Sequence, residues 1–398
     1  MSKMSYLAKL LDGVGVEWFP LGDVTQYEQP TNYLVAEKNY SDEFDTPVLT
    51  AGKTFILGYT EEVDGIYQAS QSPVIIFDDF TTANKWVDFD FKVKSSAMKM
   101  ITSRDENSVL LKYIYYWLNT LPNELVDGDH KRQWIGTFIS KRIPIPCPDN
   151  PKKSLEIQAE IVRRLDAFTS LTAELIAELI AELTLRKKQY NHYRDQLLSF
   201  EDGDVEWKTL GEVSNITIGE FVRKDKQNSN AKYPVYNGGR TPTGYYEEYN
   251  NDGDKIVVSA RGANAGFVNK SSTPYWAGNS CYSISVQDAD KLNWMYVYYY
   301  LKQSEGRLTG IQQKGGIPAV SKKQMEDFLL PIPSLAEQSR IVAILDKFDA
   351  LTHSLTEGLP REIELRQKQY EYYRDLLLSF PKPGDSVSGD KQSPGSHA

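Results

Sequence analysis

The fifteen residues RKKQYNHYRDQLLSF (186–200) return as RQKQYEYYRDLLLSF (366–380), with eleven identical positions and an offset of 180. The stretch upstream repeats at the same offset, because QAEIVRRLDAFTSLT (158–172) returns as QSRIVAILDKFDALT (338–352). A fixed internal period is the mark of a chain that contains one structural unit more than once. The sequence therefore predicts a pseudo-two-fold internal repeat.

Shorter motifs repeat around these segments. VEWFPLGDV (16–24) returns as VEWKTLGEV (205–213), and IPIP (143–146) returns as LPIP (330–333). The residues between the motifs are less alike, which predicts that two divergent domains alternate with two similar helical segments. The start of the chain, LLDGVGVEW, also resembles LLSFEDGDVEW (197–207). We therefore expect residues 1–18 to lie near the end of the second helical segment.

An apolar stripe identifies the helical segments. It consists of Ile161, Leu165, Phe168, Leu175, Leu179 and Leu183 in the first copy, and of Ile341, Leu345, Phe348 and Leu355 in the second. Spacings of mostly three and four residues are typical of an amphipathic helix. No Gly or Pro occurs from Gln158 to Ser199, so the first copy is predicted to form one helix of about 60 Å. Antiparallel pairing with the second copy is the simplest geometry.

The second copy departs from the first at TEGLPREIELRQKQY (356–370). Proline lacks the amide hydrogen of a helical turn and clashes with the preceding turn. Gly358 and Pro360 therefore predict two shorter helices in this region, with Pro360 at the start of the second one.

The stretch LTAELIAELIAEL (171–183) repeats a four-residue unit three times between the two domains. Each unit consists of good helix formers, and it adds about 6 Å of rise and about 400° of rotation to a helix. Adding or removing a unit would preserve the helix while changing its length. The pattern predicts an adjustable spacer, and the alternative is an ordinary low-complexity stretch of coiled coil.

The composition limits the class of protein. The chain has 398 residues, enough for two or three domains, and a net charge of −9. Its two cysteines, Cys147 and Cys281, are far apart, which indicates a reducing cytoplasm rather than a disulfide framework or zinc cluster. No apolar run approaches the roughly 20 residues that span a membrane. Because the overall charge is acidic, any contact with DNA must come from local groups of basic residues.

The sequence contains only weak matches to catalytic motifs. AGKT (51–54) lacks the first glycine of a phosphate-binding loop, because Pro47 occupies that position. No Asn/Asp-Pro-Pro-aromatic methylase motif occurs, and His130 has no evident nucleophile partner. Asp79, Asp90 and Lys92 superficially fit a metal-dependent nuclease pattern, which remains the enzymatic alternative.

Together these motifs resemble the specificity subunits of type I restriction–modification systems. The resemblance covers about residues 15 to 380 and is carried by the VEW motifs, the IPIP and LPIP boundaries and the two pairs of helical repeats. The TAEL-type repeat resembles the spacer of the type IC subgroup, in which the number of repeats is tied to the gap within a bipartite DNA site.

The resemblance implies an α+β fold with two α/β target recognition domains separated by a long antiparallel helical pair, or coiled coil. The corresponding segments are an N-terminal recognition domain at 1–154, a central helical spacer at 155–203, a second recognition domain at 204–334, a C-terminal helical region at 335–380 and a disordered tail at 381–398.

The resemblance also implies a cytoplasmic, non-catalytic subunit that binds double-stranded DNA and no membrane. Two methylation subunits, which bind S-adenosylmethionine and methylate adenine N6, would dock on it. Two restriction subunits, which use ATP and Mg, would join for cleavage. The chain itself is expected to bind no cofactor.

Side chains that bond base edges specify sequence, while Lys and Arg on phosphates set position. The DNA-binding candidates are Lys53, Thr54, Lys85, Trp86, Lys99, His130, Lys131 and Arg132 in the first domain, and Arg240, Thr241, Arg261, Asn264, Asn279 and Lys314 in the second. Most lie in polar, Gly-rich segments between apparent strands and are expected in loops. The alternative for each cation is a solvated surface charge, and for each Asn a turn cap.

The repeated helical ends are the candidate docking surface for partner subunits. The residues chosen are Tyr190, Tyr193, Arg194, Tyr370, Tyr373 and Arg374. The alternative is that these segments are alike because they meet one another in a helical pair. The Tyr-rich stretches KYIYYWLN (112–119) and MYVYYYLK (295–302) are predicted to be packed helices rather than platforms for stacking bases.

The sequence thus predicts a subunit that binds an asymmetric, bipartite duplex site, with each domain reading one half-site mainly in the major groove. A scaffold with two protein-binding domains on a coiled coil is the alternative of another class.

Overall fold

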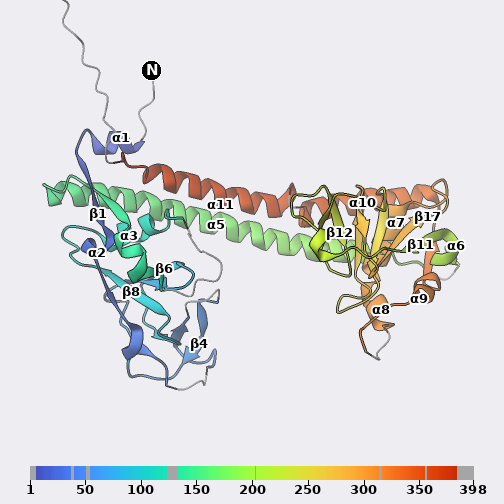
Figure 1. Ribbon diagram of the computed structural model, residues 1–398, viewed down its shortest axis with the longest axis horizontal. Coiled ribbons are helices and arrows are strands. Elements are labelled where there is room, and N and C mark those ends of the chain that lie inside the picture. Colours follow the sequence, from blue (N-terminus) through green and yellow to red (C-terminus); the bar gives the residue numbers. More distant parts are fainter. Residues whose placement is uncertain are drawn as a thin grey trace, which may run out of the picture. The chain divides into compact units, whose positions relative to one another are not determined.

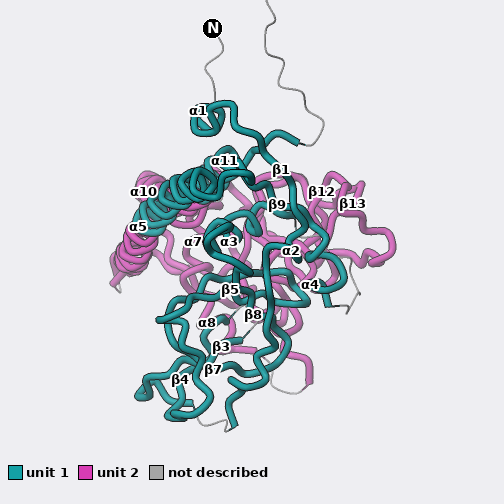
Figure 2. Tube along the Cα trace, turned by 90° about the vertical axis from the view of Figure 1, so that its left-hand side faces the viewer, with its two compact units in different colours: residues 1–176, 365–398 teal, residues 177–364 magenta. Residues whose placement is uncertain are grey.

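The computed structural model describes residues 6–36, 40–50, 54–122, 132–201, 203–312, 316–354 and 356–382. The chain divides into two compact units: unit 1 contains Met1–Ile176 and Leu365–Ala398, and unit 2 contains Ala177–Glu364 (Figure 2). Each unit holds one mixed α/β domain together with helical segments from both halves of the chain. The predicted tail from 383 onward lies outside the described residues.

The domain of unit 1 is built on three small sheets. Its elements are α1 (Tyr6–Leu11), β1 (Val16–Pro20), α2 (Leu21–Val24), β2 (Thr25–Glu28), η1 (Pro30–Tyr33), β3 (Thr46–Leu49), β4 (Ile56–Thr60), β5 (Val74–Asp78), β6 (Asn84–Val87), β7 (Lys92–Val93), β8 (Met98–Ser103), α3 (Leu111–Leu118), α4 (Gln133–Gly136), η2 (Phe138–Ser140) and β9 (Arg142–Pro146). In the described residues, the strand orders are β2-β8-β5-β6, β4-β3-β7 and β1-β9.

The domain of unit 2 repeats this topology. Its elements are β10 (Glu206–Thr209), α6 (Leu210–Val213), β11 (Ser214–Ile218), η3 (Lys224–Lys226), β12 (Tyr233–Tyr236), β13 (Gly244–Tyr246), β14 (Lys255–Ser259), β15 (Val268–Ser271), β16 (Trp276–Ala277), β17 (Cys281–Val286), α7 (Trp294–Gln303), α8 (Glu305–Gly310), α9 (Lys322–Glu326) and β18 (Leu329–Ile332). The orders β11-β17-β14-β15, β13-β12-β16 and β10-β18 match those of unit 1 strand for strand. The predicted internal repeat and α/β domains are therefore confirmed.

The repeated VEW and PIP motifs form the two-stranded sheets. Trp18 pairs with Pro144 in the antiparallel register of β1 and β9, and Trp207 pairs with Pro331 in that of β10 and β18. The first and last strands of each domain are thus hydrogen-bonded to each other. This pairing explains why both motifs recur together in the sequence.

The central helix α5 (Pro151–Leu197) is continuous over 47 residues, about 70 Å at 1.5 Å per residue. It begins seven residues before the predicted Gln158, and Pro151 suits a first turn because proline there removes no needed donor. The predicted break in the second copy is confirmed, since α10 (Leu335–His353) and α11 (Gly358–Leu377) are separate helices. Gly358 has φ +77°, and a Cβ there would collide with the carbonyl oxygens of Ala350 and Leu351.

Antiparallel helix pairing is seen within each unit. In unit 1, α11 runs beside α5 (Figure 1), and the ring of Phe168 on α5 lies 5.9 Å from that of Tyr373 on α11. In unit 2, Tyr193 on α5 stacks on Phe348 of α10 at 5.7 Å, and Tyr190 lies 5.6 Å from His353. Residue numbers rise along one helix as they fall along the other, as predicted.

The apolar stripe is predicted to face a partner helix, but its first residues pack inside the domain cores instead. Ile161 and Leu165 are completely buried in the core of the first domain, and Ile341 and Leu345 occupy the same places in the second. The N-terminal part of each stripe therefore belongs to a domain core, and the later part faces a partner helix. Sequence periodicity reports an apolar face but cannot name what covers it.

The Tyr-rich helices α3 and α7 are packed against these helices, as predicted. Tyr116 donates a hydrogen bond of 2.6 Å to Asp166, and Tyr299 donates one of 2.6 Å to Asp346. Burial raises the pKa of both hydroxyls, and the carboxylate partners raise it further. The equivalent bonds in the two units show that each domain is fixed to its following helix in the same way.

The chain start meets the end of α11, as the sequence predicted. The indole Nε1 of Trp18 donates to the carbonyl oxygen of Pro381 at 2.9 Å. Leu7 and Leu11 of α1 are buried in one cluster with Leu377 and Phe380. In unit 1, α1 and β1 therefore pack against the end of α11 and the residues that follow it.

Within the residues described, no helix combines the length and hydrophobicity needed to cross a bilayer.

Candidate nucleic-acid interface

Four loop segments of unit 2 converge at one end of its domain. They are the β12–β13 loop (237–243), the β14–β15 loop (260–267), the β16–β17 loop (278–280) and the segment before α9 (316–321). The amide of Ala260 donates to Ser280 at 2.7 Å, and that of Gly262 donates to Pro318 at 2.9 Å. A Cβ on Gly238 would lie 2.9 Å from the carbonyl oxygen of Arg261, so glycine at φ +77° permits this close approach.

Five predicted residues of the second domain come from these loops. Arg240 and Thr241 lie in the first loop, Arg261 and Asn264 in the second, and Asn279 in the third. The Nε of Arg240 donates to Oδ1 of Asn264 at 3.3 Å, and Nδ2 of Asn264 donates to the carbonyl oxygen of Gly238 at 3.3 Å. The side chain of Asn264 therefore joins two loops. Lys314 lies outside the described residues.

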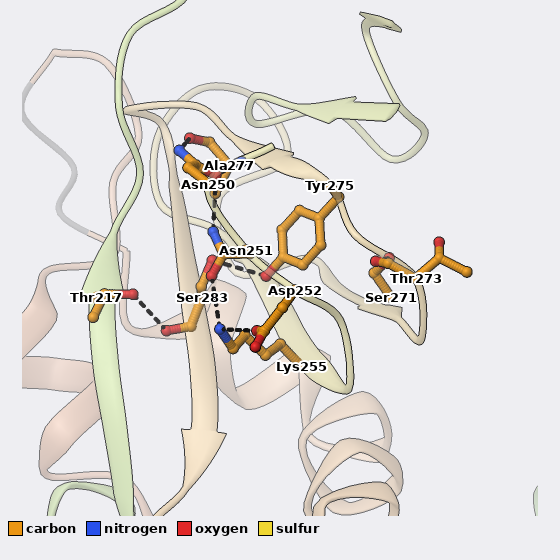
Figure 3. Close-up of polar contacts among 10 residues, drawn as sticks. All are labelled: Thr217, Asn250, Asn251, Asp252, Lys255, Ser271, Thr273, Tyr275, Ala277 and Ser283. Atoms are coloured by element: carbon orange, nitrogen blue, oxygen red, sulfur yellow. Dashed lines mark hydrogen bonds and ion pairs between the residues drawn. The ribbon is translucent and has the colours of Figure 1, made fainter. Parts of the chain in front are cut away.

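A polar network fixes the smaller sheet of unit 2 to the larger one (Figure 3). Asn250 and Ala277 exchange two hydrogen bonds, of 3.0 and 2.7 Å. The hydroxyl of Tyr275, just before β16, donates to Ser283 on β17 at 2.9 Å. Because β16 leads directly into the loop that carries Asn279, the network also fixes the position of that loop.

In unit 1, the β5–β6 loop, the β7–β8 loop and the segment before α4 meet around Asp79. Its amide donates to Ala97 in the β7–β8 loop at 3.4 Å. Its carboxylate accepts a bond of 2.8 Å from the amide of Trp134, and its carbonyl accepts one of 2.8 Å from Gln133. The exposed Arg132 directly precedes these residues, and the exposed Thr54 lies in the β3–β4 loop. Lys53, His130 and Lys131 lie outside the described residues.

The structure corrects the prediction for Lys99. Its side chain is completely buried on the central strand β8, with Nζ 3.4 Å from Oδ2 of Asp79 and 5.2 Å from the ring centre of Tyr27. A buried ammonium cannot reach a DNA phosphate, so the prediction that Lys99 contacts DNA is wrong. The motif MKMITS does not reveal that both faces of this strand are covered.

Lys85 and Trp86 lie on strand β6 rather than in a loop. Trp86 is half-buried, and its Nε1 donates to Asp88 at 3.1 Å. Its ring lies 6.0 Å from that of Tyr115, so Trp86 packs on the domain. Lys94, which is not among the predicted residues, is half-exposed in the β7–β8 loop with Nζ 5.5 Å from the ring centre of Tyr40. Its position before β8 is equivalent to that of the Asn279 loop before β17.

The structure does not support the nuclease pattern. Asp79 is paired with the buried Lys99, Asp90 accepts hydrogen bonds from Ser70, and Lys92 is paired with Glu62 at 2.9 Å. The three residues therefore have separate partners. Across the described parts of the chain, no group of three or more His, Cys, Asp or Glu side chains is placed to hold a metal ion.

The candidate docking residues differ in accessibility. Tyr190 is 5% exposed and packs on Phe348 and His353, and burial raises its pKa to about 12. The prediction that Tyr190 docks a partner is therefore wrong. Tyr193 and Tyr373 are 40% and 42% exposed.

The other docking candidates are held by neighbours. Arg194 and Arg374 form ion pairs of 2.7 Å with the adjacent Asp195 and Asp375. The hydroxyl of Tyr370 accepts a bond of 3.0 Å from Thr169. These residues thus contribute to their own helical pairs as well as to the surface.

A groove of about 660 Å³ runs between the end of α5 and α10 in unit 2. Its lining includes Tyr193, Leu197, Phe200, Arg340, Ile344 and Phe348. In unit 1, α1 covers the equivalent place, since Tyr6 donates to Glu160 at 2.8 Å and stacks under Arg164 at 4.3 Å. Equivalent surfaces are therefore covered in one unit and open in the other.

This architecture defines a class: two divergent domains of one topology, each with a loop-rich end, built on paired helices. The family model described as the type I restriction modification DNA specificity domain matches residues 13–185 and again 203–365. The chain belongs to this family, the type I restriction–modification specificity subunits.

Relatives agree with this assignment over nearly the whole chain. The specificity subunit of the type I restriction enzyme EcoR124I/EcoR124II of Escherichia coli is 55% identical, over 96% of this chain and 99% of that protein. The EcoprrI specificity subunit of Escherichia coli is 32% identical, over 90% and 93% respectively.

Solved structures show the same fold at low sequence identity. The S subunit of a type I restriction–modification system from M. genitalium has a TM-score of 0.54 at 18% identity, covering 96% of this chain and 100% of that one. A chain from another solved type I system has a TM-score of 0.59 at 18% identity, covering 92% and 97%.

Proposed function

We propose that this chain reads an asymmetric, bipartite duplex DNA site for a type I restriction–modification complex, and that it performs no chemistry itself. Each domain would read one half-site, mainly in the major groove. The observation that carries the proposal is the repeated topology with unlike loops. Equivalent ends present Thr54, Lys94 and Arg132 in unit 1 but Arg240, Arg261 and Asn264 in unit 2. One scaffold that carries two different loop sets suits two different half-sites.

Partner subunits would supply the catalytic activities. Two methylation subunits would bring S-adenosylmethionine and adenine-N6 methylation, and two restriction subunits would bring ATP- and Mg-dependent cleavage. We place the complex in the cytoplasm, where the free Cys147 and Cys281 stay reduced.

A gel shift of the chain assembled with its methylation subunits tests DNA binding. We expect binding to duplex DNA whose affinity falls as salt rises, because Lys and Arg contacts release counterions from phosphates. A protein-binding scaffold would leave duplex DNA unshifted at low salt. Cleavage of DNA by the isolated chain with a divalent metal would instead support the nuclease alternative.

The open groove of unit 2 supports docking of a methylation subunit there. Tyr193→Asp places a carboxylate in the groove at a residue that is 40% exposed. Because Tyr193 also stacks on Phe348, thermal unfolding of the variant verifies that the helical pair is intact. We expect affinity for the methylation subunit to fall about 30-fold or more, the effect of losing an interface hot spot. Isothermal titration with the purified partner measures this.

A matched control keeps the charge change but moves it away from the helices. Ile218→Asp alters a residue that is 53% exposed on strand β11 of the same unit, and it should leave the affinity for the methylation subunit unchanged. Equal affinities for the Tyr193→Asp variant and the wild type would show that the partner docks elsewhere. Normal co-purification after joint replacement of Arg194 and Arg374 would likewise remove those residues from the docking surface.

A further inference from the structure

We propose that Arg240 reads a guanine in the half-site of the second domain, and that Asn264 and Phe267 hold its guanidinium in the reading position. The inference deepens the proposed function and rests on it. It assigns different tasks to two exposed arginines of one loop cluster, Arg240 and Arg261.

Arg240 is constrained along its length by neighbouring segments. Its Nε donates to Oδ1 of Asn264 at 3.3 Å, and its guanidinium carbon lies 5.5 Å from the ring centre of Phe267. Its carbonyl oxygen accepts a bond of 3.1 Å from Nδ2 of Asn269 on β15. The long side chain therefore loses less rotational freedom when it binds than an unrestrained arginine would.

The supporting residues are themselves held. Asn264 donates to the carbonyl oxygen of Gly238, so its amide cannot turn freely. The ring of Phe267 is covered by Lys302, whose Nζ lies 4.0 Å from the ring centre. Lys302 is in turn bonded to Glu305 at 2.7 Å. The side chain of Arg240 is therefore held by restrained neighbours, unlike that of a free surface arginine.

The outer end of Arg240 is available. In the portion of the chain that the structure describes, its two terminal nitrogens have no hydrogen-bond partner and no carboxylate pairs with it. Most other arginines differ, because Arg223, Arg340 and Arg361 each form an ion pair of 2.6 or 2.7 Å with an acidic neighbour. Arg240 shares the lack of an acidic partner with Arg261, but Arg240 alone of the two is held by Asn264 and Phe267.

Guanine is the base that fits this arrangement. Its O6 and N7 lie side by side in the major groove and accept both terminal nitrogens of one arginine, which is the commonest specific protein–DNA contact. Adenine presents a donor at the equivalent edge and would oppose the fork. Arg261 shares the loop cluster, but its side chain has no hydrogen bond among the described residues. We therefore assign Arg261 to a phosphate, where orientation matters less.

The test is selection of bound duplexes from a pool randomised in both half-sites, with the chain assembled with its methylation subunits. Wild-type protein should select a guanine at a position where Arg240→Gln no longer prefers guanine. The preference there should fall roughly ten- to a hundredfold, while the other half-site stays unchanged. Asn264→Ala should weaken the same position by a smaller factor. Arg240→Lys should also relax it, because an ammonium lacks the fork.

Arg261→Gln is the matched control. It should weaken binding to all sequences alike and lower the slope of log affinity against log salt by about one. If Arg240→Gln behaves like Arg261→Gln, or if the position that it relaxes is not a guanine, the inference fails while the proposed function stands. If the wild-type complex selects no sequence at all, the proposed function fails and the inference fails with it. Thermal unfolding of each variant verifies that the exposed substitutions leave the fold intact.

Discussion

Deleting the four residues 176–179 from α5 is expected to shorten the gap of the recognised DNA site by one to two base pairs and to abolish modification of the original site. The deletion shortens a continuous helix by about 6 Å, and one base pair rises about 3.4 Å along the duplex. Both half-sites should keep their sequences, because the deletion touches neither loop cluster. Mapping methylated adenines in cells that express the complete system measures gap and half-sites together.

A length-matched control separates spacing from sequence. Glu178→Gln alters the same repeat but keeps every residue of the helix, so it should leave the gap as it is. An altered half-site with an unchanged gap in the deletion variant would refute the spacer hypothesis. An unchanged gap alone would show that the number of repeats has no role in measuring DNA, and would favour an ordinary coiled coil.

Replacing Asp79 with Ala is expected to destabilise unit 1 by about 3–5 kcal/mol, because it leaves the ammonium of Lys99 buried without its counterion. Lys99 is completely buried and Asp79 is 1% exposed. The same carboxylate holds the amide of Trp134, so the segment that presents Arg132 should loosen as well. A fall in unfolding temperature on the order of 10 °C and a weaker preference in the first half-site are the expected results.

The double variant Asp79→Asn, Lys99→Met tests the cause. It removes both charges, and buried ion pairs replaced by neutral groups of similar volume often lose little stability. We expect it to recover most of the unfolding temperature. It should also keep the bond to Trp134, because the side-chain oxygen of the introduced asparagine can still accept it. If the double variant unfolds as early as Asp79→Ala, the loss arises from packing and not from the buried charge.

Much of the architecture could be predicted because the chain repeats itself. The offset of 180 residues gave the two equivalent helical segments, and the breaker Gly358 gave the division between α10 and α11. The VEW and PIP motifs marked domain ends, although their pairing as strands required the structure. These features are local or periodic, so a single sequence contains them.

The errors concern burial. Lys99 looks like a surface lysine in the sequence but lies on the central strand of its sheet. Tyr190 belongs to a polar-looking helix end, yet Phe348 and His353 cover it. The bond between Arg240 and Asn264 joins two residues that are 24 positions apart in different loops. Each of these facts depends on which distant segment of the chain packs beside the residue, and a local sequence pattern does not reveal that segment.

The two-stranded sheets β1–β9 and β10–β18 have a consequence for how such chains diversify. Each joins the entry of a domain to its exit, so the chain between VEW and PIP enters and leaves its domain at one short two-stranded sheet. Such an insert is an exchangeable cassette as long as it keeps the contacts that fix the domain to its helix, such as the Tyr116–Asp166 and Tyr299–Asp346 bonds. Under the proposed function, one such exchange would change a half-site preference while both helical segments stay as they are.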